Sequence, residues 1–187
     1  MQVVFLCGGV GSRMSPLPGD KSGLKFLGKT LLEHQVETAL AAGLSDLVVV
    51  ANRQNADALE GILHSYTEAR VGLAVQTEPS GMGGALRAAR HLVEGEVIVV
   101  SPGDVVDASA YQSVLSARER VSATSYLLGT KVGRYFPGGY LVLDSNGEIR
   151  RVVEKPGPGA GPSDVVTIVV HLHSDIEALF RHLADER

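Results

Sequence analysis

The chain has 187 residues, 44% of them apolar, and a formal net charge of −4 at pH 7. This length and apolar content fit a single domain with a full hydrophobic core, and the acidic balance argues against a nucleic-acid surface, which needs a basic excess or a basic stripe. The only cysteine, Cys7, excludes an internal disulfide and a cysteine-based metal site, and no apolar run reaches the roughly 18 residues of a membrane span, so we expect a soluble protein of the cytoplasm.

Strand and helix patterns alternate through the first half of the chain. Short β-branched runs predict strands at 3–7, 47–51, 71–76 and 97–101, and helical patterns follow them at 31–42, 55–65, 82–93 and 108–117. Strand–helix units in series predict an α/β fold: a Rossmann-like, mostly parallel sheet flanked by helices. Gly43 stands where the first helix should end, a usual place for glycine.

From residue 122 onward, strands follow one another without helices between them. We expect strands at 125–130, 140–144 and 149–154, with Asn146-Gly147 as the hairpin turn between the last two. A glycine- and proline-rich loop then leads to a strand at 165–170 and a helix at 176–184. The second half is thus predicted to be a β-rich portion over the carboxyl ends of the parallel strands, where ligands bind in such folds.

A glycine-rich loop follows the first strand directly. It holds Gly8, Gly9 and Gly11, then Ser12 and Arg13, and Lys21 comes later in the same connection. Glycines let the backbone approach a ligand and point successive N–H groups into one concavity, while the basic side chains add charge for phosphate oxygens. The loop is therefore predicted to bind phosphates.

Two other phosphate motifs match in letters only. Gly9-Val10-Gly11 lacks the third glycine of a dinucleotide fingerprint, because Met14 stands in its place. Residues 23–30 match the P-loop pattern G-x-x-x-x-G-K-[ST], but no strand precedes them and large side chains fill their interior. We expect Thr30 at the start of a helix instead.

Separated motifs along most of the chain resemble those of the sugar-1-phosphate nucleotidyltransferases, of the glucose-1-phosphate thymidylyl or mannose-1-phosphate guanylyl type. They are residues 8–17 with Lys21 and residues 28–35, then Gln76 with 81–85, Gly103-Asp104, Gly139-Tyr140 and residues 153–156. The resemblance implies the nucleotide-diphospho-sugar transferase fold. It also implies an enzyme that moves a nucleoside monophosphate from a triphosphate to a sugar 1-phosphate and releases pyrophosphate.

The resemblance implies a role for each matching residue. Arg13 would stabilise departing pyrophosphate, and Lys21 would neutralise the α-phosphate. Lys21 is preferred to Lys25 because the family lysine stands eight residues before the lysine of the G-K-P motif, which is Lys29 in this chain. Nucleotide contacts would come from Gly8, Gly9, Gly11, Ser12, Arg13, Lys21, Gln76 and Gly81. Asp104 would hold Mg²⁺, the expected cofactor, and Gly139, Glu154 and Lys155 would contact the acceptor. One domain, 1–187, would then have a nucleotide-binding half (1–121) and an acceptor-binding half (122–187).

Acidic residues and histidines are also assigned from chemistry alone. Asp104 follows a buried strand at the edge where ligands bind, so a metal role is open to it beside that of a turn residue. Asp107 is placed to cap the next helix. His171, His173 and Asp175 alternate at a strand end, a pattern more typical of hydrogen-bonded histidines than of a metal site.

The chain departs from the family in two places. Residues 165–169 are apolar or threonine where the family has an asparagine and a glycine that meet the sugar, and a second metal ligand has no clear candidate. We therefore expect a chain cut short at its C-terminus or a different mechanism. The alternatives are a compact enzyme acting on a non-sugar phosphate, similar to molybdenum-cofactor guanylyltransferases, and a nucleotide-binding regulatory module without turnover. The base, the acceptor and the oligomeric state stay open, and no nucleic acid or membrane is expected as a partner.

Overall fold

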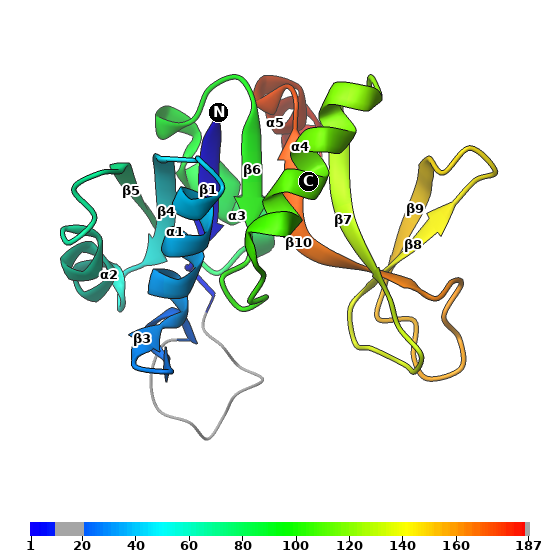
Figure 1. The fold of residues 1–187 in the computed structure, drawn as a ribbon, viewed down its shortest axis with the longest axis horizontal. Coiled ribbons are helices and arrows are strands. Elements are labelled where there is room, and N and C mark those ends of the chain that lie inside the picture. Colours follow the sequence, from blue (N-terminus) through cyan, green and yellow to red (C-terminus); the bar gives the residue numbers. More distant parts are fainter. Residues whose placement is uncertain (10–20, 186–187) are drawn as a thin grey trace. The chain divides into compact units, whose positions relative to one another are not determined.

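The computed structural model describes residues 1–9 and 21–185, which form two compact units (Figure 1). The first unit comprises Met1–Tyr126 and the chain from Val170 onward, and the second comprises Leu127–Val169. The chain passes from one unit to the other within β7 (Ser125–Lys131) and returns within β10 (Val165–His173). The end of β10 and the last helix therefore belong to the first unit.

A mostly parallel sheet forms the centre of the first unit. Its parallel strands are β1 (Gln2–Leu6), β4 (Asp46–Asn52), β5 (Arg70–Gln76) and β6 (Val97–Val100), in the order β5-β4-β1-β6. The end of β10 pairs with β6 in the antiparallel direction, with Val170 opposite Val100. β1, β4 and β6 are mostly buried, and strands buried on both faces read as continuous apolar runs, which explains why the sequence indicated these three clearly.

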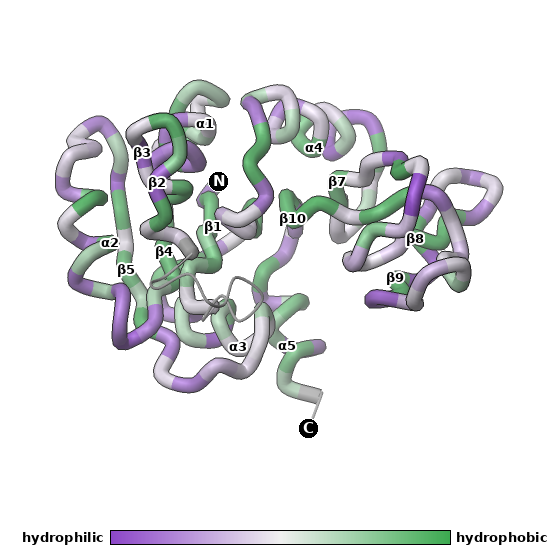
Figure 2. The backbone as a smooth tube through the Cα atoms, turned by 90° about the horizontal axis from the view of Figure 1, so that it is seen from below, coloured by the Kyte–Doolittle hydropathy of each residue, from purple (hydrophilic) through white to green (hydrophobic). Residues whose placement is uncertain are grey.

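Helices cover both faces of this sheet (Figure 2). α1 (Leu31–Ala41) and α4 (Ala108–Arg120) lie side by side on one face. α3 (Gly81–Ala88) and α5 (Ile176–Asp185) share a hydrophobic core on the other face with residues of β1, β4, β5 and β6, and α2 (Ala56–Leu63) packs against β4 and β5. The predicted α/β fold, a mostly parallel sheet flanked by helices, is confirmed.

The second unit is built from strands. β8 (Gly139–Leu143) and β9 (Ile149–Glu154) form an antiparallel hairpin, and Gly147 in its turn has a φ of 82°. The carboxylate of Asp144 accepts the backbone N–H groups of Asn146 and Glu148 at 2.8 and 3.0 Å, which holds the turn closed. The predicted hairpin is therefore present.

One helix is shorter than the sequence predicts. The helix expected over 82–93 ends at Ala88, and a 3-10 turn, η3 (Arg90–Leu92), follows it. The side chain of Gln2 donates to Leu92 O at 2.8 Å and draws this segment to the edge of the sheet.

In residues 1–9 and 21–185, no helix combines the length and the apolar content needed to cross a membrane.

Candidate functional site

The carboxyl ends of the parallel strands bring the candidate nucleotide-binding residues to one edge of the first unit. Gly8 and Gly9 follow β1, Gln76 ends β5, Gly81 begins α3, and Asp104 follows β6. Ligands bind at this edge in α/β folds. Gly11, Ser12 and Arg13 lie outside the described residues, and the description of Lys21 is limited to its backbone, in the 3-10 helix η2 (Lys21–Gly23).

Gly8 and Gln76 lie directly against each other. A Cβ at Gly8 would lie 2.6 Å from Gln76 Oε1 and 3.4 Å from Ala51 O, so any larger residue would push the glutamine away. Gln76 is 7% exposed, and its Nε2 donates to Ser80 Oγ and Gly81 O over 3.4 Å each. Hydrogen bonds of that length are weak, so the amide can exchange them for better ones with a ligand.

Two asparagines hold the backbone that enters the glycine-rich loop. Asn55 Nδ2 donates to Cys7 O at 2.9 Å, and Asn52 Nδ2 donates to Gly8 O at 3.3 Å. Asn55 is 3% exposed and also accepts the N–H of Asn52 at 2.8 Å. The sequence analysis missed this pair, although two asparagines just past a buried strand are a signal for side chains that bind nearby backbone.

The turn after β6 fixes the backbone of Asp104. Asp104 N donates to Ser101 O at 3.0 Å, and Asp104 O accepts the side-chain amide of Gln35 at 2.7 Å. Within the described part of the chain, three or more His, Cys, Asp or Glu residues that could hold a metal ion do not come together. If Asp104 holds Mg²⁺, substrate phosphates and water would have to supply the other ligands, since Mg²⁺ usually keeps several waters.

Asp107 has the structural role predicted for it. Its carboxylate accepts Ser109 N at 2.8 Å at the start of α4, and it also accepts the Ser109 hydroxyl. These hydrogen bonds hold the pKa of Asp107 below its ordinary value. Asp107 therefore caps α4.

The segment that matches the P-loop pattern is a β-hairpin. β2 (Lys25–Phe26) pairs with β3 (Lys29–Thr30) across Leu27 and Gly28, whose φ values are 50° and 85°. Positive φ at both central residues is typical of the tight turns that join two strands. The Lys29 ammonium lies 2.7 Å from the carboxylate of Glu37 in α1. The rejection of a P-loop is confirmed.

Thr30 forms a capping box with Glu33 at the start of α1. Thr30 Oγ1 accepts Glu33 N at 3.2 Å, and the Glu33 carboxylate accepts Thr30 N at 2.6 Å, which lowers the pKa of Glu33. Replacing such a cap by alanine costs about 1 kcal/mol. Thr30→Ala should therefore lower the free energy of unfolding in urea by about that amount and leave triphosphate affinity unchanged.

Thr30→Ser keeps the hydroxyl group and is the matched control for stability. Calorimetric titration of each variant with nucleotide and Mg²⁺ measures the affinity. Loss of Mg²⁺-dependent nucleotide binding in Thr30→Ala would revive the P-loop interpretation, because a P-loop threonine binds the metal.

The three predicted acceptor residues lie together in the second unit. Gly139 pairs with Glu154 across β8 and β9, and a Cβ at Gly139 would lie 3.3 Å from Glu154 Oε2. Lys155 Nζ lies 2.9 Å from Glu154 Oε1, and Lys155 N donates to Gly138 O at 3.0 Å. Lys155 has a φ of 42°, a left-handed conformation that costs energy outside glycine and that clusters at functional sites.

Val166, in the stretch where the family has sugar-contacting residues, is part of the core. It is 0% exposed and lies opposite Tyr140 in the ladder between β10 and β8. Thr167 Oγ1 donates to Leu128 O at 3.3 Å. These side chains support the sheet of the second unit.

The histidines at the end of β10 are hydrogen-bonded or packed together. His173 Nδ1 lies 2.9 Å from Ser125 Oγ, and the rings of His171 and His173 meet edge to face with centroids 6.3 Å apart. Asp175 accepts Ala178 N at 3.0 Å at the start of α5. The interpretation of these residues as structural rather than metal-binding agrees with this geometry.

Burial lowers the pKa of His173. The folded chain therefore binds the proton less readily than the unfolded chain, in which histidine has a pKa of about 6.5. The free energy of unfolding should fall as the pH is lowered through about 6.5 toward the folded-state pKa, because protonation then favours the unfolded chain. His173→Gln should reduce this slope in urea denaturation, and an unchanged slope would show that another group causes it.

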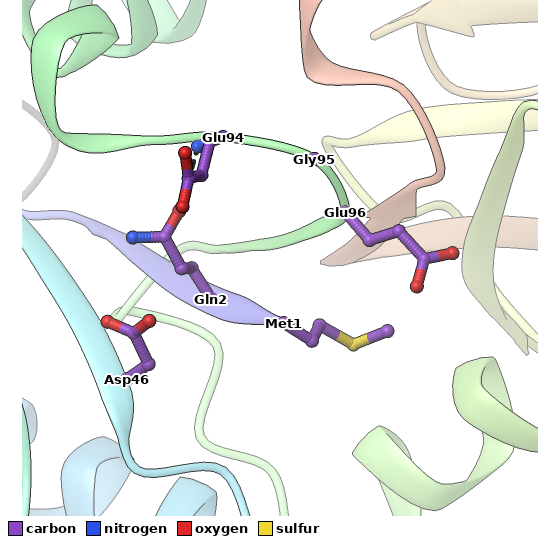
Figure 3. A pocket seen from close by; sticks show the side chains of 6 residues that line it. All are labelled: Met1, Gln2, Asp46, Glu94, Gly95 and Glu96. Carbon is purple, nitrogen blue, oxygen red and sulfur yellow. Dashed lines mark hydrogen bonds between the residues drawn. The ribbon is translucent and has the colours of Figure 1, made fainter.

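A shallow pocket lies at the opposite edge of the sheet, at the amino ends of β1, β4 and β6 (Figure 3). Its lining is Met1, Gln2, Asp46, Glu94, Gly95 and Glu96. Asp46 binds Arg70, and Glu96 binds Arg118. Because carboxylates line this pocket, it does not suit a phosphate.

The chain is similar to known proteins over most of its length. The family model for nucleotidyl transferases matches residues 2–171. A mannose-1-phosphate guanyltransferase of Emericella nidulans is 30% identical over 165 residues, which cover 83% of this chain and 45% of that protein. Mannose-1-phosphate guanylyltransferase 1 of Arabidopsis thaliana is 29% identical over 164 residues, with the same coverage, 83% and 45%. The chain thus spans about half the length of these curated relatives.

Solved structures show the same fold. UDP-glucose pyrophosphorylase complexed with UDP-glucose matches with a TM-score of 0.82 at 19% identity, over 98% of this chain and 79% of that chain. The apo form of UDP-glucose pyrophosphorylase matches with a TM-score of 0.80. The resemblance inferred from the motifs is confirmed, and because the family model covers most of its length, the chain belongs to the nucleotidyl transferase family.

Proposed function

We propose that the chain transfers a nucleoside monophosphate from a nucleoside triphosphate to a sugar 1-phosphate and releases pyrophosphate. The observation that carries the proposal is the edge of the sheet at which Gly8, Gln76 and Asp104 follow or end the parallel strands β1, β5 and β6. Family membership and relatives named for mannose 1-phosphate and UDP-glucose support a sugar phosphate as the acceptor.

We infer the nucleotide contacts from this edge together with the family resemblance. Gly8 lets the Gln76 amide lie against the start of the glycine-rich loop, and the present hydrogen bonds of this amide are long, so it is available to a base. We assign the base to Gln76 and Gly81 and the phosphates to Gly9, Gly11 and Ser12. The nucleotide-binding half, 1–121, and the acceptor-binding half, 122–187, with Gly139, Glu154 and Lys155, keep the roles that the family resemblance implies.

The reaction is an in-line displacement at the α-phosphorus. An oxygen of the acceptor phosphate forms a bond to this phosphorus, and the bond from the phosphorus to the bridging oxygen breaks, so that the electron pair leaves with pyrophosphate. The acceptor phosphate is already an anion near neutral pH and needs no general base. Lys21 would neutralise the α-phosphate and Arg13 the leaving pyrophosphate, since such transfers depend on alignment and on positive charge.

We further propose Mg²⁺ as the cofactor and the cytoplasm as the location. When bound between Asp104 and the triphosphate, Mg²⁺ would supply positive charge to the phosphate oxygens. A single cysteine, buried at Cys7, is compatible with a reducing compartment. The net charge of −4 supports small-molecule partners over nucleic acid.

A second candidate is transfer to a non-sugar phosphate. It is favoured by residues 165–169, where Val166 is fully buried in place of a polar residue that meets the sugar. The same reaction at the α-phosphorus would apply, with a different acceptor.

A substrate panel tests the proposal. The chain is mixed with Mg²⁺, one of the triphosphates ATP, GTP, UTP, CTP and dTTP, and one acceptor, either a hexose 1-phosphate or a non-sugar phosphate, and pyrophosphate release is measured. One pair should give turnover well above that of the triphosphate alone. Release with non-sugar phosphates only would favour the second candidate, and nucleotide binding without release under all conditions would indicate a regulatory module.

A further inference from the structure

A buried polar chain connects α4 through α1 to the turn that carries Asp104. Tyr111 in α4 donates to Gln35 Oε1 over 3.5 Å, and Gln35 Nε2 donates to Asp104 O over 2.7 Å. Tyr111 and Gln35 are both 0% exposed. A buried amide is costly unless it is hydrogen-bonded, and the short bond of this amide is the one to Asp104.

This bond bridges segments far apart in the sequence. Gln35 and Asp104 are 69 positions apart, and Asp104 N is held within its own turn by Ser101 O. The next residue, Val105, is 56% exposed. Because the buried Gln35 amide holds the carbonyl of Asp104, the position of the Asp104 Cα is restricted. The direction in which the carboxylate side chain leaves the backbone is then restricted as well.

Helix α1 is also joined to the segment that follows Lys21. Leu31 N donates to Leu24 O at 3.0 Å, and η2 packs against α1. The capping box at Thr30 fixes the beginning of the same helix. One rigid helix thus holds both the Lys21 segment and the Asp104 turn.

We propose that Gln35 is a positioning residue for nucleotidyl transfer, holding the Asp104 backbone so that the carboxylate meets the magnesium–triphosphate complex in the required geometry. The inference rests on the proposed function of Asp104. Mg²⁺ demands near-ideal octahedral geometry, and loss of a group that orients a ligand typically costs about 10–100-fold in metal affinity or activity. Gln35 does not touch the substrate in this assignment and acts through Asp104.

The chain offers a matched control at the other edge of the sheet. Gln2 is 5% exposed and donates to Leu92 O at 2.8 Å. It also accepts Glu94 N at 2.9 Å, and both Gln2 and Glu94 are drawn in Figure 3. Gln2→Met and Gln35→Met each remove a buried amide that binds a backbone carbonyl, and both should lower stability. A merely structural role of Gln35 would make the two variants alike in metal binding.

Gln35→Glu provides a second variant that keeps the side-chain shape. Burial raises the pKa of a carboxyl group, so the protonated form can donate an O–H to Asp104 O in place of the amide. In this variant, the binding of Mg²⁺ together with nucleotide should be retained at low pH, where the carboxyl group is protonated. It should be lost as the carboxyl group ionises. This pH dependence keeps the test decisive if Gln35→Met does not fold.

The experiment titrates Mg²⁺ into each folded variant with and without GTP or UTP, whichever binds the wild type, and measures amide hydrogen exchange at residues 101–106. Gln35→Met should weaken Mg²⁺ binding in the presence of nucleotide about 10–100-fold, leave metal-free nucleotide affinity unchanged, and speed exchange at 101–106, while Gln2→Met should do none of these. Equal metal binding in wild type and Gln35→Met, or an equal loss in Gln2→Met, would overturn the inference. Absence of Mg²⁺ coupling in the wild type itself would instead overturn the proposed role of Asp104, and the inference with it.

Discussion

Lys21→Ala should lower turnover by about 10²–10³-fold, because it removes a positive charge where negative charge accumulates in the transition state. The assignment rests on the spacing of Lys21 to Lys29, which matches the family pattern. Interactions stronger in the transition state than in the ground state act on kcat, so triphosphate affinity should change less than turnover. Pyrophosphate release under saturating substrates measures kcat.

Lys25→Ala is the matched control for this lysine. Lys25 is an exposed residue of β2, opposite Thr30 in the hairpin, and lies in the same connection between β1 and α1. Its substitution should change turnover far less. Equal losses in the two variants, or a larger loss in Lys25→Ala, would show that the alignment of the family lysine to Lys21 is wrong.

Asp104→Asn should abolish the coupling between Mg²⁺ and the triphosphate. A single carboxylate holds Mg²⁺ mainly with help from phosphates and water, so the wild type should bind the metal poorly alone and well together with nucleotide. The fold should persist, because asparagine keeps the two backbone contacts of this residue, in which Asp104 N donates to Ser101 O and Asp104 O accepts Gln35 Nε2. Calorimetric titration with Mg²⁺, with and without nucleotide, measures the coupling.

Asp107→Asn is the control three residues further along the chain. Its carboxylate caps α4, and asparagine is also a good cap, so stability and metal coupling should both be nearly unchanged. Tight Mg²⁺ binding to nucleotide-free wild type would contradict the single-carboxylate site. Loss of coupling in Asp107→Asn would place the metal elsewhere in this turn.

The fold was predictable wherever local pattern and tertiary environment agree. The strands β1, β4 and β6 are buried along nearly their whole length, so their sequences are apolar except at the ends of β1 and β4. The dipeptide Asn146-Gly147 predicted the turn between β8 and β9. The hairpin of β2 and β3 was missed because Leu27 at a left-handed position is not a usual turn residue, and only Gly28 carried the signal.

The sequence predicts at which edge of the sheet the candidate site lies, but not the contacts between the residues of the site. Parallel strands place their carboxyl ends together, which predicts Asp104 at the ligand-binding edge of the sheet, whereas Gln76 was assigned through the family resemblance. The 2.6 Å approach of Gln76 to a Cβ at Gly8 depends on backbone positions that periodicity does not specify. Gln35 was missed as a functional residue because its partner carbonyl lies 69 positions away.

The measurement that tests nucleotidyl transfer most directly is phosphorus NMR of the complete reaction. The chain is incubated with Mg²⁺, the preferred triphosphate and the preferred sugar 1-phosphate, and both phosphorus products are followed in time. We expect pyrophosphate and a nucleoside diphosphate sugar to appear in equal amounts, with the sugar phosphate signal lost at the same rate. Pyrophosphate accompanied by free nucleoside monophosphate, or an unchanged spectrum with nucleotide bound, would contradict the account.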